Sequence, residues 1–137
     1  MKSKMRSRLA ELPQSIDMQI LAMRQQFPQF WYLPTIRSWI GTLTPRKNKP
    51  ITYLIKVMYP FGEYPQVRVL SPDIRHDAPH TYRDMTLCLY RPADESWTSA
   101  KLIANTIVPW TAEWLRYYEI WLNTGFWCGP EAPHIVK

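Results

Sequence analysis

The stretch ITYLIKVMYPFGEYPQVRVL, residues 51–70, decides the fold of this chain. Over Ile51–Tyr59 the side chains alternate with a period of two, and both alternating sets are largely apolar. This pattern is typical of a strand inside a sheet. The corner Tyr64-Pro65 follows and leads into a short strand around Val67–Leu70. The stretch therefore predicts two consecutive strands of one sheet.

The residues before this stretch extend the same sheet. A further strand is predicted around Thr35–Leu43 from its apolar and β-branched residues. Residues 44–50, which are polar and include two prolines, connect it to the next strand as a turn. Consecutive strands with short connections are typical of an antiparallel meander.

Helical patterns flank the predicted sheet. An apolar stripe near the N-terminus predicts a helix of about four turns, with Pro13 in its first turn. The stripe consists of Leu12, Ile16, Ile20, Met23 and Phe27. A second stripe predicts C-terminal helices, with Pro109 either kinking one helix or opening a second, and with Gly125 as the cap at the end. Its members are Ile103, Ile107, Trp110, Trp114, Tyr118 and Trp121.

Residues 71–98 form a long connection between the sheet and the second helical pattern. Several prolines break any period there, apart from the short apolar stretch Leu87-Cys88-Leu89. A loop of this length in a compact domain is usually functional. The order of helix, sheet, long loop and helices predicts an α+β fold, in which helices cover one face of the sheet.

The composition fits one folded domain. With 137 residues, the chain is expected to form a single domain over 1–137, with residues 1–11 as a basic, flexible N-terminus. A hydrophobic share of 46% and an aromatic share of 14% argue against an intrinsically disordered chain. Two cysteines cannot build the disulfide framework of a small secreted domain. Because the basic start does not lead into an apolar secretory segment, we expect a cytoplasmic protein with no membrane association.

The net charge of +6 is unevenly distributed: residues 1–50 carry +7 and residues 51–137 carry −1. A basic N-terminal part of this kind can bind an acidic partner, nucleic acid or an anionic surface. Without a basic run interleaved with aromatic residues, nucleic-acid binding is a weak alternative. A domain of that kind would use Lys2, Lys4, Arg6, Arg8, Arg46, Lys47 and Lys49.

The element order and several motifs resemble the ubiquitin-conjugating fold, especially its bacterial branch from CBASS-type antiphage defence operons, over about residues 13–134. The residues YLIKVMYP at 53–60, followed by Tyr64-Pro65, are similar to the third strand and the Tyr-Pro corner of the family. The family places the Pro and Asn of a His-Pro-Asn triplet nine and eight residues before its catalytic cysteine. Pro79 and His80 stand at those offsets from Cys88.

Further motifs continue the resemblance downstream of Cys88. Cys88-Leu89 matches the Cys-Leu pair of the family, and Trp97-Thr98 is similar to its Trp-Ser, one residue further from the cysteine. The tail WLNTGFW at 121–127 and GPEAPH at 129–134 is similar to the bacterial branch. The chain departs from the triplet in two places, since Ala78 replaces its His and His80 replaces its Asn. The resemblance implies an α+β ubiquitin-conjugating-like fold with an antiparallel four-stranded meander and a long active-site loop.

The resemblance also implies three catalytic residues. Cys88 would carry an acyl group as a thioester, because a thiol serves both as nucleophile and as leaving group. His80, in place of the Asn that supports the oxyanion, would donate a ring N–H or accept the proton of the amine. Asp84 would orient or deprotonate that amine. The structural alternatives are a buried, hydrophobic Cys88, a His80 that braces the loop, and a solvated turn aspartate at 84.

Other nucleophile and metal hypotheses are weaker. Cys128 is interpreted as a packing residue, because no family motif places a thiol there. His134 matches a position of the bacterial branch, with docking of the tail on the core as its alternative. His76 and His80 are four residues apart, but Pro79 argues against a helix between them, so no metal is expected. No cofactor is expected either, since the chain lacks a glycine-rich phosphate loop.

The resemblance implies that the acyl donor is the C-terminus of a protein partner, a cGAS/DncV-like nucleotidyltransferase. Nothing in 137 residues could hold an adenylating domain, so a separate activating enzyme or a partner that arrives activated is expected. A catalytically silent adaptor of the same fold, which binds and regulates the nucleotidyltransferase, is the alternative. The missing family Asn favours that alternative.

Overall fold

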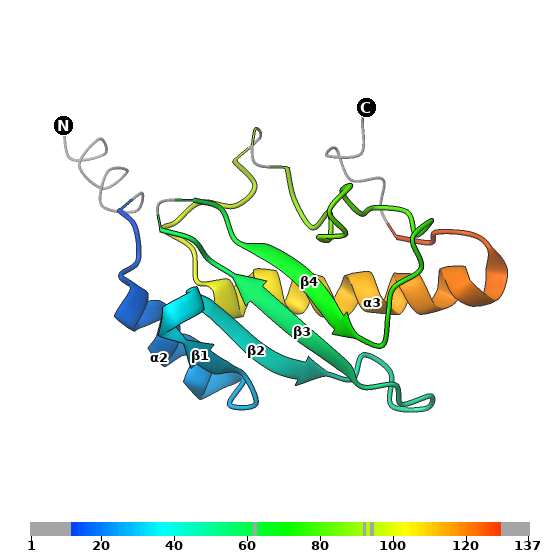
Figure 1. Cartoon of the computed structure of the whole chain (residues 1–137), viewed down its shortest axis with the longest axis horizontal. Helices are drawn as coiled ribbons and strands as arrows, with labels where there is room; N and C mark the ends of the chain where they lie inside the picture. Colours follow the sequence, from blue (N-terminus) through cyan, green and yellow to red (C-terminus); the bar gives the residue numbers. More distant parts are fainter. Residues whose placement is uncertain (1–11, 62, 92, 94, 130–137) are drawn as a thin grey trace, which may run out of the picture.

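The structure, a computed structural model, describes residues 12–61, 63–91, 93 and 95–129. Its elements confirm the predicted α+β class with a four-stranded antiparallel meander, as Figure 1 shows. The helices and strands are α2 (Ile16–Gln26), β1 (Trp31–Leu33), β2 (Ser38–Leu43), β3 (Tyr53–Met58), β4 (Gln66–Ser71) and α3 (Ile107–Thr124). Two 3-10 turns, η1 (Pro34–Ile36) and η3 (Ile103–Asn105), precede β2 and α3.

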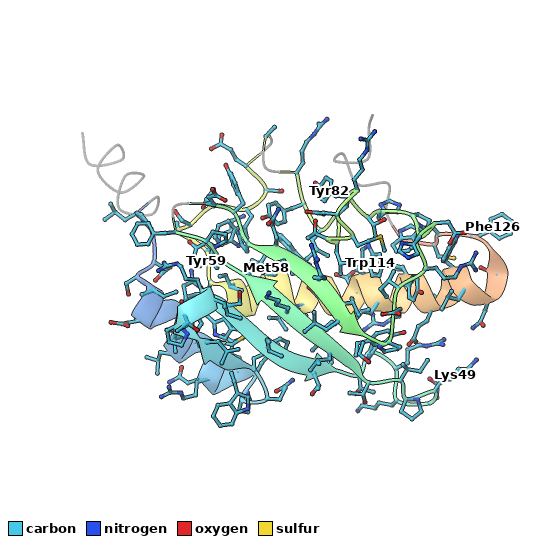
Figure 2. The ribbon with its side chains drawn as sticks, in the orientation of Figure 1. Lys49, Met58, Tyr59, Tyr82, Trp114 and Phe126 are labelled. Carbon is cyan, nitrogen blue, oxygen red and sulfur yellow. The ribbon has the colours of Figure 1, made fainter. Side chains whose placement is uncertain are left out.

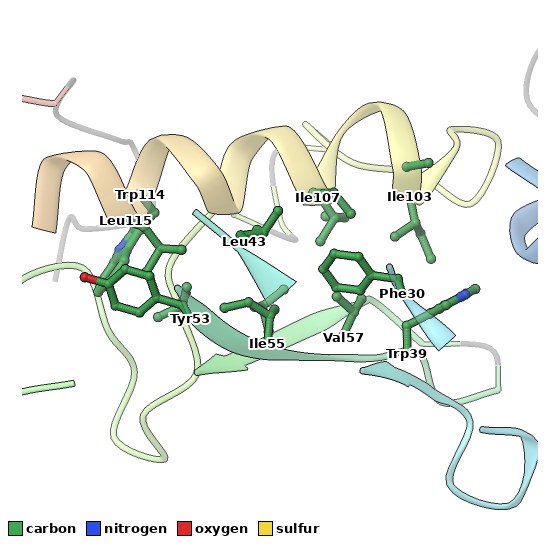
Figure 3. Close-up of a cluster of buried hydrophobic side chains, with 14 of the residues drawn as sticks. Phe30, Trp39, Leu43, Tyr53, Ile55, Val57, Ile103, Ile107, Trp114 and Leu115 are labelled. Atoms are coloured by element: carbon green, nitrogen blue, oxygen red, sulfur yellow. The ribbon is translucent and has the colours of Figure 1, made fainter. Parts of the chain in front are cut away.

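The strand predicted to lie inside the sheet does so. In the order β1-β2-β3-β4, the strand β3 pairs with β2 on one side and with β4 on the other. Tyr53, Ile55 and Val57 alternate along it and are all buried. Figure 3 shows Ile55 and Val57 directed toward Ile107 of α3, so the predicted cover of one sheet face by a helix is present.

The N-terminal helix is shorter than its apolar stripe predicts. Ser15 is its N-cap, and the hydroxyl of Ser15 accepts a hydrogen bond from the Met18 amide at 3.1 Å. A serine in this position satisfies a free amide of the first turn and thereby fixes the start of the helix. Pro13 therefore precedes α2, and the prediction that it lies in the first turn is wrong. Leu12 also precedes the helix and is exposed.

The strand predicted around Thr35–Leu43 is present as β2 but begins only at Ser38, and the short strand β1 precedes the predicted range. Pro34 favours an extended residue before it and occupies the first position of η1, after which Arg37 takes a left-handed conformation with φ of 48°. The chain reverses there, so that β1 pairs antiparallel with β2. Within β2, Gly41 is required because a Cβ at this position would overlap the ring of Phe30.

The second apolar stripe forms η3 and one long helix. Pro109 lies in the first turn of α3, where its missing N–H breaks no helical hydrogen bond, so it opens a helix and does not kink one. The prediction of more than one C-terminal α-helix is replaced, in the described residues, by α3 and this 3-10 turn. Gly125 caps α3 with φ of 81° and donates its N–H to Trp121 O at 2.8 Å, which confirms the predicted cap.

Two buried polar side chains hold the elements together. The amide of Gln19 on α2 donates to Lys101 O and accepts from the Ile103 amide, each at 2.9 Å. Arg46, one of the basic residues of the nucleic-acid hypothesis, is paired with the buried Glu119 at 2.6 Å.

The basic residues of segment 1–11, and His134, lie outside the described residues. Within the described part of the chain, no helix is both long and apolar enough to cross a membrane.

Candidate active site

The three predicted catalytic residues lie in one segment of the long loop where the chain reverses its direction. We call this segment, residues 80–88, the flap. Thr81 and Leu87 form an antiparallel bridge across it. At its tip the Tyr82 amide donates to Thr86 O, and the Met85 amide donates to Tyr82 O, both at 2.9 Å. Met85 has a φ of 69°, which gives the left-handed residue that such a tight reversal needs.

The base of the flap is anchored to the sheet and to α3. The Leu87 amide donates to Val67 O on β4 at 2.9 Å, and the Cys88 amide donates to His80 O at 2.8 Å. The same carbonyl accepts a hydrogen bond from the indole of Trp114 on α3 at 3.0 Å. The backbone around Cys88 is therefore fixed between two elements that are distant in sequence.

The Cys88 side chain is buried, with 8% of the residue exposed. Burial raises the pKa of its thiol to about 11, and the negative charge of Asp84 acts in the same direction. A hydrogen bond with the hydroxyl of Tyr82 lowers the pKa, but less than burial raises it. At neutral pH the sulfur is therefore a thiol, as the alternative of a buried cysteine implies.

His80 contacts Cys88 through its backbone and Trp127 through its ring. The imidazole stacks on the indole of Trp127, with ring centroids 4.6 Å apart and an interplanar angle of 22°. His80 itself has a φ of 60°, a left-handed conformation that a histidine adopts only when its surroundings hold it there. The bracing role that was the alternative for His80 is thus visible in its contacts.

Asp84 is an exposed residue that closes the tip of the flap. One carboxylate oxygen accepts from the Thr86 hydroxyl at 2.6 Å and from the Thr86 amide at 3.0 Å. These two bonds hold the pKa of Asp84 below its ordinary value, with a smaller contribution from the charge of Arg68. The contacts of Asp84 are those of a turn aspartate, and its charge also reaches the sulfur of Cys88.

A groove of about 840 Å³ lies beside the flap. It is lined by Glu63, Tyr64, Pro65, Gln66, Tyr82, Arg83, Asp84, Thr86, Leu87 and Tyr90. Tyr90 is held in its wall, because its hydroxyl donates to Pro65 O and its ring packs on Trp97. Figure 2 shows Tyr82 beyond the β4 edge of the sheet. Tyr82, whose hydroxyl lowers the pKa of Cys88, is therefore a residue of the groove wall.

The interpretation of Cys128 as a packing residue is wrong. Cys128 follows the end of α3, and it is exposed. It follows Trp127, which takes up the contact with the flap. Both cysteines are free. Across the residues that the structure describes, no group of three or more His, Cys, Asp or Glu is arranged to hold a metal ion.

Sequence reasoning missed the contacts made by Trp114 and Trp127. Trp114 was assigned to the core as part of an apolar stripe, which it is, but its indole N–H also binds the flap. Trp127 lies outside the helical phase, and its signals were its place in the tail motif WLNTGFW and its position soon after a capping glycine. A helical period predicts which face of a helix is buried and not which loop rests on it.

Comparison with known families gives a match over most of this chain. The profile of the family E2-CBASS, described as Type II CBASS E2 protein, matches residues 19–135. The match includes Cys88, the rest of the flap and the whole sheet. The comparison with curated proteins found no match.

Proposed function

The chain belongs to the family of Type II CBASS E2 proteins, and from this premise we propose that it is a ubiquitin-conjugating-like cysteine transferase. Membership of the family assigns the protein to a CBASS system of antiviral defence and gives it an E2-like fold. In the proposed reaction, Cys88 carries the C-terminus of a protein partner as a thioester and passes it to an amine. The proposed partner is a cGAS/DncV-like nucleotidyltransferase.

The position of Cys88 beside the groove is the observation that supports this proposal. Leu87, which precedes Cys88 in the chain, lines the groove together with Tyr82, whose hydroxyl lowers the pKa of the Cys88 thiol. The Cys88 backbone is fixed by the bond to His80 O at 2.8 Å. A partner tail that enters the groove would therefore meet a thiol held in one place, and such positioning lowers the barrier to attack.

The proposed reaction has two steps. For loading, the Cys88 thiol gives its proton to a base, its sulfur attacks the carbonyl carbon of an activated acyl group, and the activating group leaves as the C–S bond forms. The activated group is a thioester or an acyl adenylate supplied by a separate enzyme. For transfer, an amine attacks that carbonyl, the C–N bond forms, the C–S bond breaks, and the amine loses a proton.

The pKa of Cys88 sets a requirement on the loading step. With a pKa of about 11, roughly one thiol in ten thousand is ionised at pH 7. Docking of the partner has to lower this pKa or move a base toward the sulfur. In the proposed mechanism His80 supports the oxyanion or accepts the amine proton, and Asp84 orients the amine; both lie in the flap with Cys88.

Substitution of Cys88 tests the proposal directly. Incubation of the wild-type protein with the activated nucleotidyltransferase is expected to give a higher band that disappears under reducing conditions. Cys88→Ser should give a band that resists reducing agent, because an oxyester forms in place of the thioester. Cys88→Ala should give no band while it still binds the partner, and Cys128→Ser, at the exposed cysteine, should behave like the wild type.

A catalytically silent adaptor of the same fold is the second candidate, and the burial of Cys88 favours it. A thiol with 8% of its residue exposed and a pKa of about 11 is a poor nucleophile at rest. An adaptor would bind the nucleotidyltransferase without forming a covalent adduct. It predicts that Cys88→Ala preserves both binding and defence against phage, whereas the transferase predicts that defence is lost and binding is kept.

A further inference from the structure

The face of the sheet that is turned away from α3 carries one row of side chains across all four strands. Trp31 of β1 is in register with Ile40 of β2, and Ile40 is in register with Lys56 of β3. Lys56 is in turn in register with Arg68 of β4. Successive side chains of a strand point to opposite faces, and Val57, next to Lys56, points toward α3. The four residues, which we call the open-face row, therefore lie on the other face.

We propose that the open-face row is a docking surface for an acidic segment of a partner protein. The proposal goes beyond the transferase reaction, since the four residues do not belong to the lining of the groove beside the flap. In Figure 1 this face of the sheet is turned toward the viewer, and no described helix lies over it. A partner can therefore reach the row without displacing any helix of the described chain.

The charges of the sheet are concentrated in this row. Lys56 and Arg68 are the only charged residues in the four described strands, and they lie directly opposite each other. Two like charges in this arrangement destabilise a sheet. Within the described part of the chain neither residue forms an ion pair, and Arg68 Nε has no hydrogen-bond partner. The charge of Arg68 does lower the pKa of Asp84 in the flap. A carboxylate held between Lys56 and Arg68 would compensate both charges through charge-assisted hydrogen bonds.

The surroundings of the two charges favour a protein over a nucleic acid or a lipid surface. Trp31, at the end of the row, is 74% exposed, and Leu33 on the same strand and face is also exposed. Ile40 and Met58 are half-buried on this face. Nucleic acids and anionic bilayers are bound by larger clusters of basic residues. Tryptophan and arginine beside apolar side chains are typical of protein interfaces, so the partner segment should combine carboxylates with apolar side chains.

Binding of labelled probes to the full-length protein tests the proposal. The probes are a fluorescent peptide of glutamate and leucine, the same peptide with glutamine in place of glutamate, and a single-stranded DNA oligonucleotide, all measured by anisotropy, and phosphatidylglycerol vesicles, measured by cosedimentation. We expect the glutamate peptide alone to bind, and to bind more weakly as salt is added. Lys56→Gln and Arg68→Gln should each weaken its binding roughly tenfold, because each removes a charged hydrogen-bond donor. Trp31→Ala should weaken it as well, since it removes the exposed apolar contact.

Lys47→Gln and Lys49→Gln are the matched controls, because each removes one positive charge from an exposed residue in the turn between β2 and β3. Both should bind the peptide like the wild type. Thermal unfolding checks the folding of the test variants. Because Lys56→Gln and Arg68→Gln each remove a repulsion between like charges, they should unfold at the wild-type temperature or above it.

Three outcomes would overturn the proposal. These are absence of binding by the glutamate peptide, an equal loss of binding in the Lys47 and Lys49 controls, and tighter binding of the DNA or the vesicles than of the peptide. Peptide binding needs no thiol, so Cys88→Ala should bind the peptide like the wild type. Failure of the proposed function and failure of this inference are therefore distinguishable.

Discussion

At the scale of single residues, two neighbours change the pKa of Cys88 in opposite directions. Burial is the largest influence and raises it, the Tyr82 hydroxyl lowers it, and the charge of Asp84 raises it. Asp84 remains charged at neutral pH, because its bonds to Thr86 hold its own pKa below the ordinary value. The same carboxylate therefore stabilises the turn and opposes ionisation of the Cys88 thiol.

We expect Asp84→Asn to make Cys88 ionise at lower pH, because it removes the charge and keeps an oxygen that can accept from Thr86. The pH midpoint for alkylation of Cys88 by iodoacetamide, measured in the Cys128→Ser background that leaves Cys88 as the only thiol, should move down. The shift applies over the whole pH range in which Cys88 ionises, because the pKa of Asp84 lies below its ordinary value and the carboxylate stays charged throughout that range.

Asp77→Asn is the control for this substitution, since Asp77 is an exposed acid outside the flap that pairs with Arg75 at 2.7 Å. It should leave the midpoint unchanged. If Asp84 also orients the amine, Asp84→Asn should slow transfer from a preformed thioester although the thiol ionises more easily. A midpoint that stays in place or rises in Asp84→Asn would contradict the assigned effect of its charge.

From the sequence, the three candidate residues could be assigned to one loop. Whether their side chains are exposed or buried could not be predicted from it. The offsets of Pro79 and His80 from Cys88 follow from a resemblance in spacing, and spacing is local. Cys88 is buried in a flap that is anchored by Trp114, which comes from a helix far along the chain. Cys128 is exposed because Trp127, and not the cysteine, fills the contact with His80.

At the scale of elements, Glu119 joins α3 to the sheet. Its two carboxylate oxygens accept from Tyr53 of β3 at 2.8 Å and from Arg46, in the turn between β2 and β3, at 2.6 Å. Glu119 and Tyr53 are each 2% exposed, so neither can exchange its partner for water. A buried carboxylate is tolerated because both of its oxygens are satisfied.

Glu119→Ala should lower the free energy of unfolding by about 3 kcal/mol, because it leaves the buried Tyr53 hydroxyl without its acceptor. Tyr53→Phe should lower the free energy of unfolding by about 1 kcal/mol, since Glu119 keeps its ion pair with Arg46. The double variant should cost clearly less than the two single costs together. Urea unfolding monitored by tryptophan fluorescence measures all three. Additive costs would show that the hydrogen bond between Glu119 and Tyr53 does not couple α3 to β3.

Long periodic elements were predictable, and short ones were not. The alternation over Ile51–Tyr59 and the helical stripe of α3 extend over enough residues for their periods to be recognised. The three residues of β1 are too few for that, and they form a strand only because Arg37 reverses the chain and places β2 beside them. Glu119 was not predicted as a buried residue, since its partners come from separate parts of the sequence.

At the scale of the whole molecule, the chain after α3 returns to contact the flap of the candidate active site. Gly125 reverses its direction, and Trp127 then packs on His80 of the flap and on Trp114 of α3, with centroids 4.6 and 5.4 Å apart. Figure 1 shows this returning segment beyond the end of α3. The flap is thus held by α3 through Trp114 and by the C-terminal segment through Trp127.

Trp127→Ala should loosen the flap as well as destabilise the protein. Loss of a half-buried indole is expected to lower the free energy of unfolding by about 2 kcal/mol. The amide of Cys88 and the indole N–H of Trp114, which both donate to His80 O, should exchange with deuterium faster than in the wild type. Phe126→Ala is the control, because Phe126 is 72% exposed and points away from the domain in Figure 2. If exchange at these two sites is equally slow in both variants, the flap is held by α3 and the sheet alone.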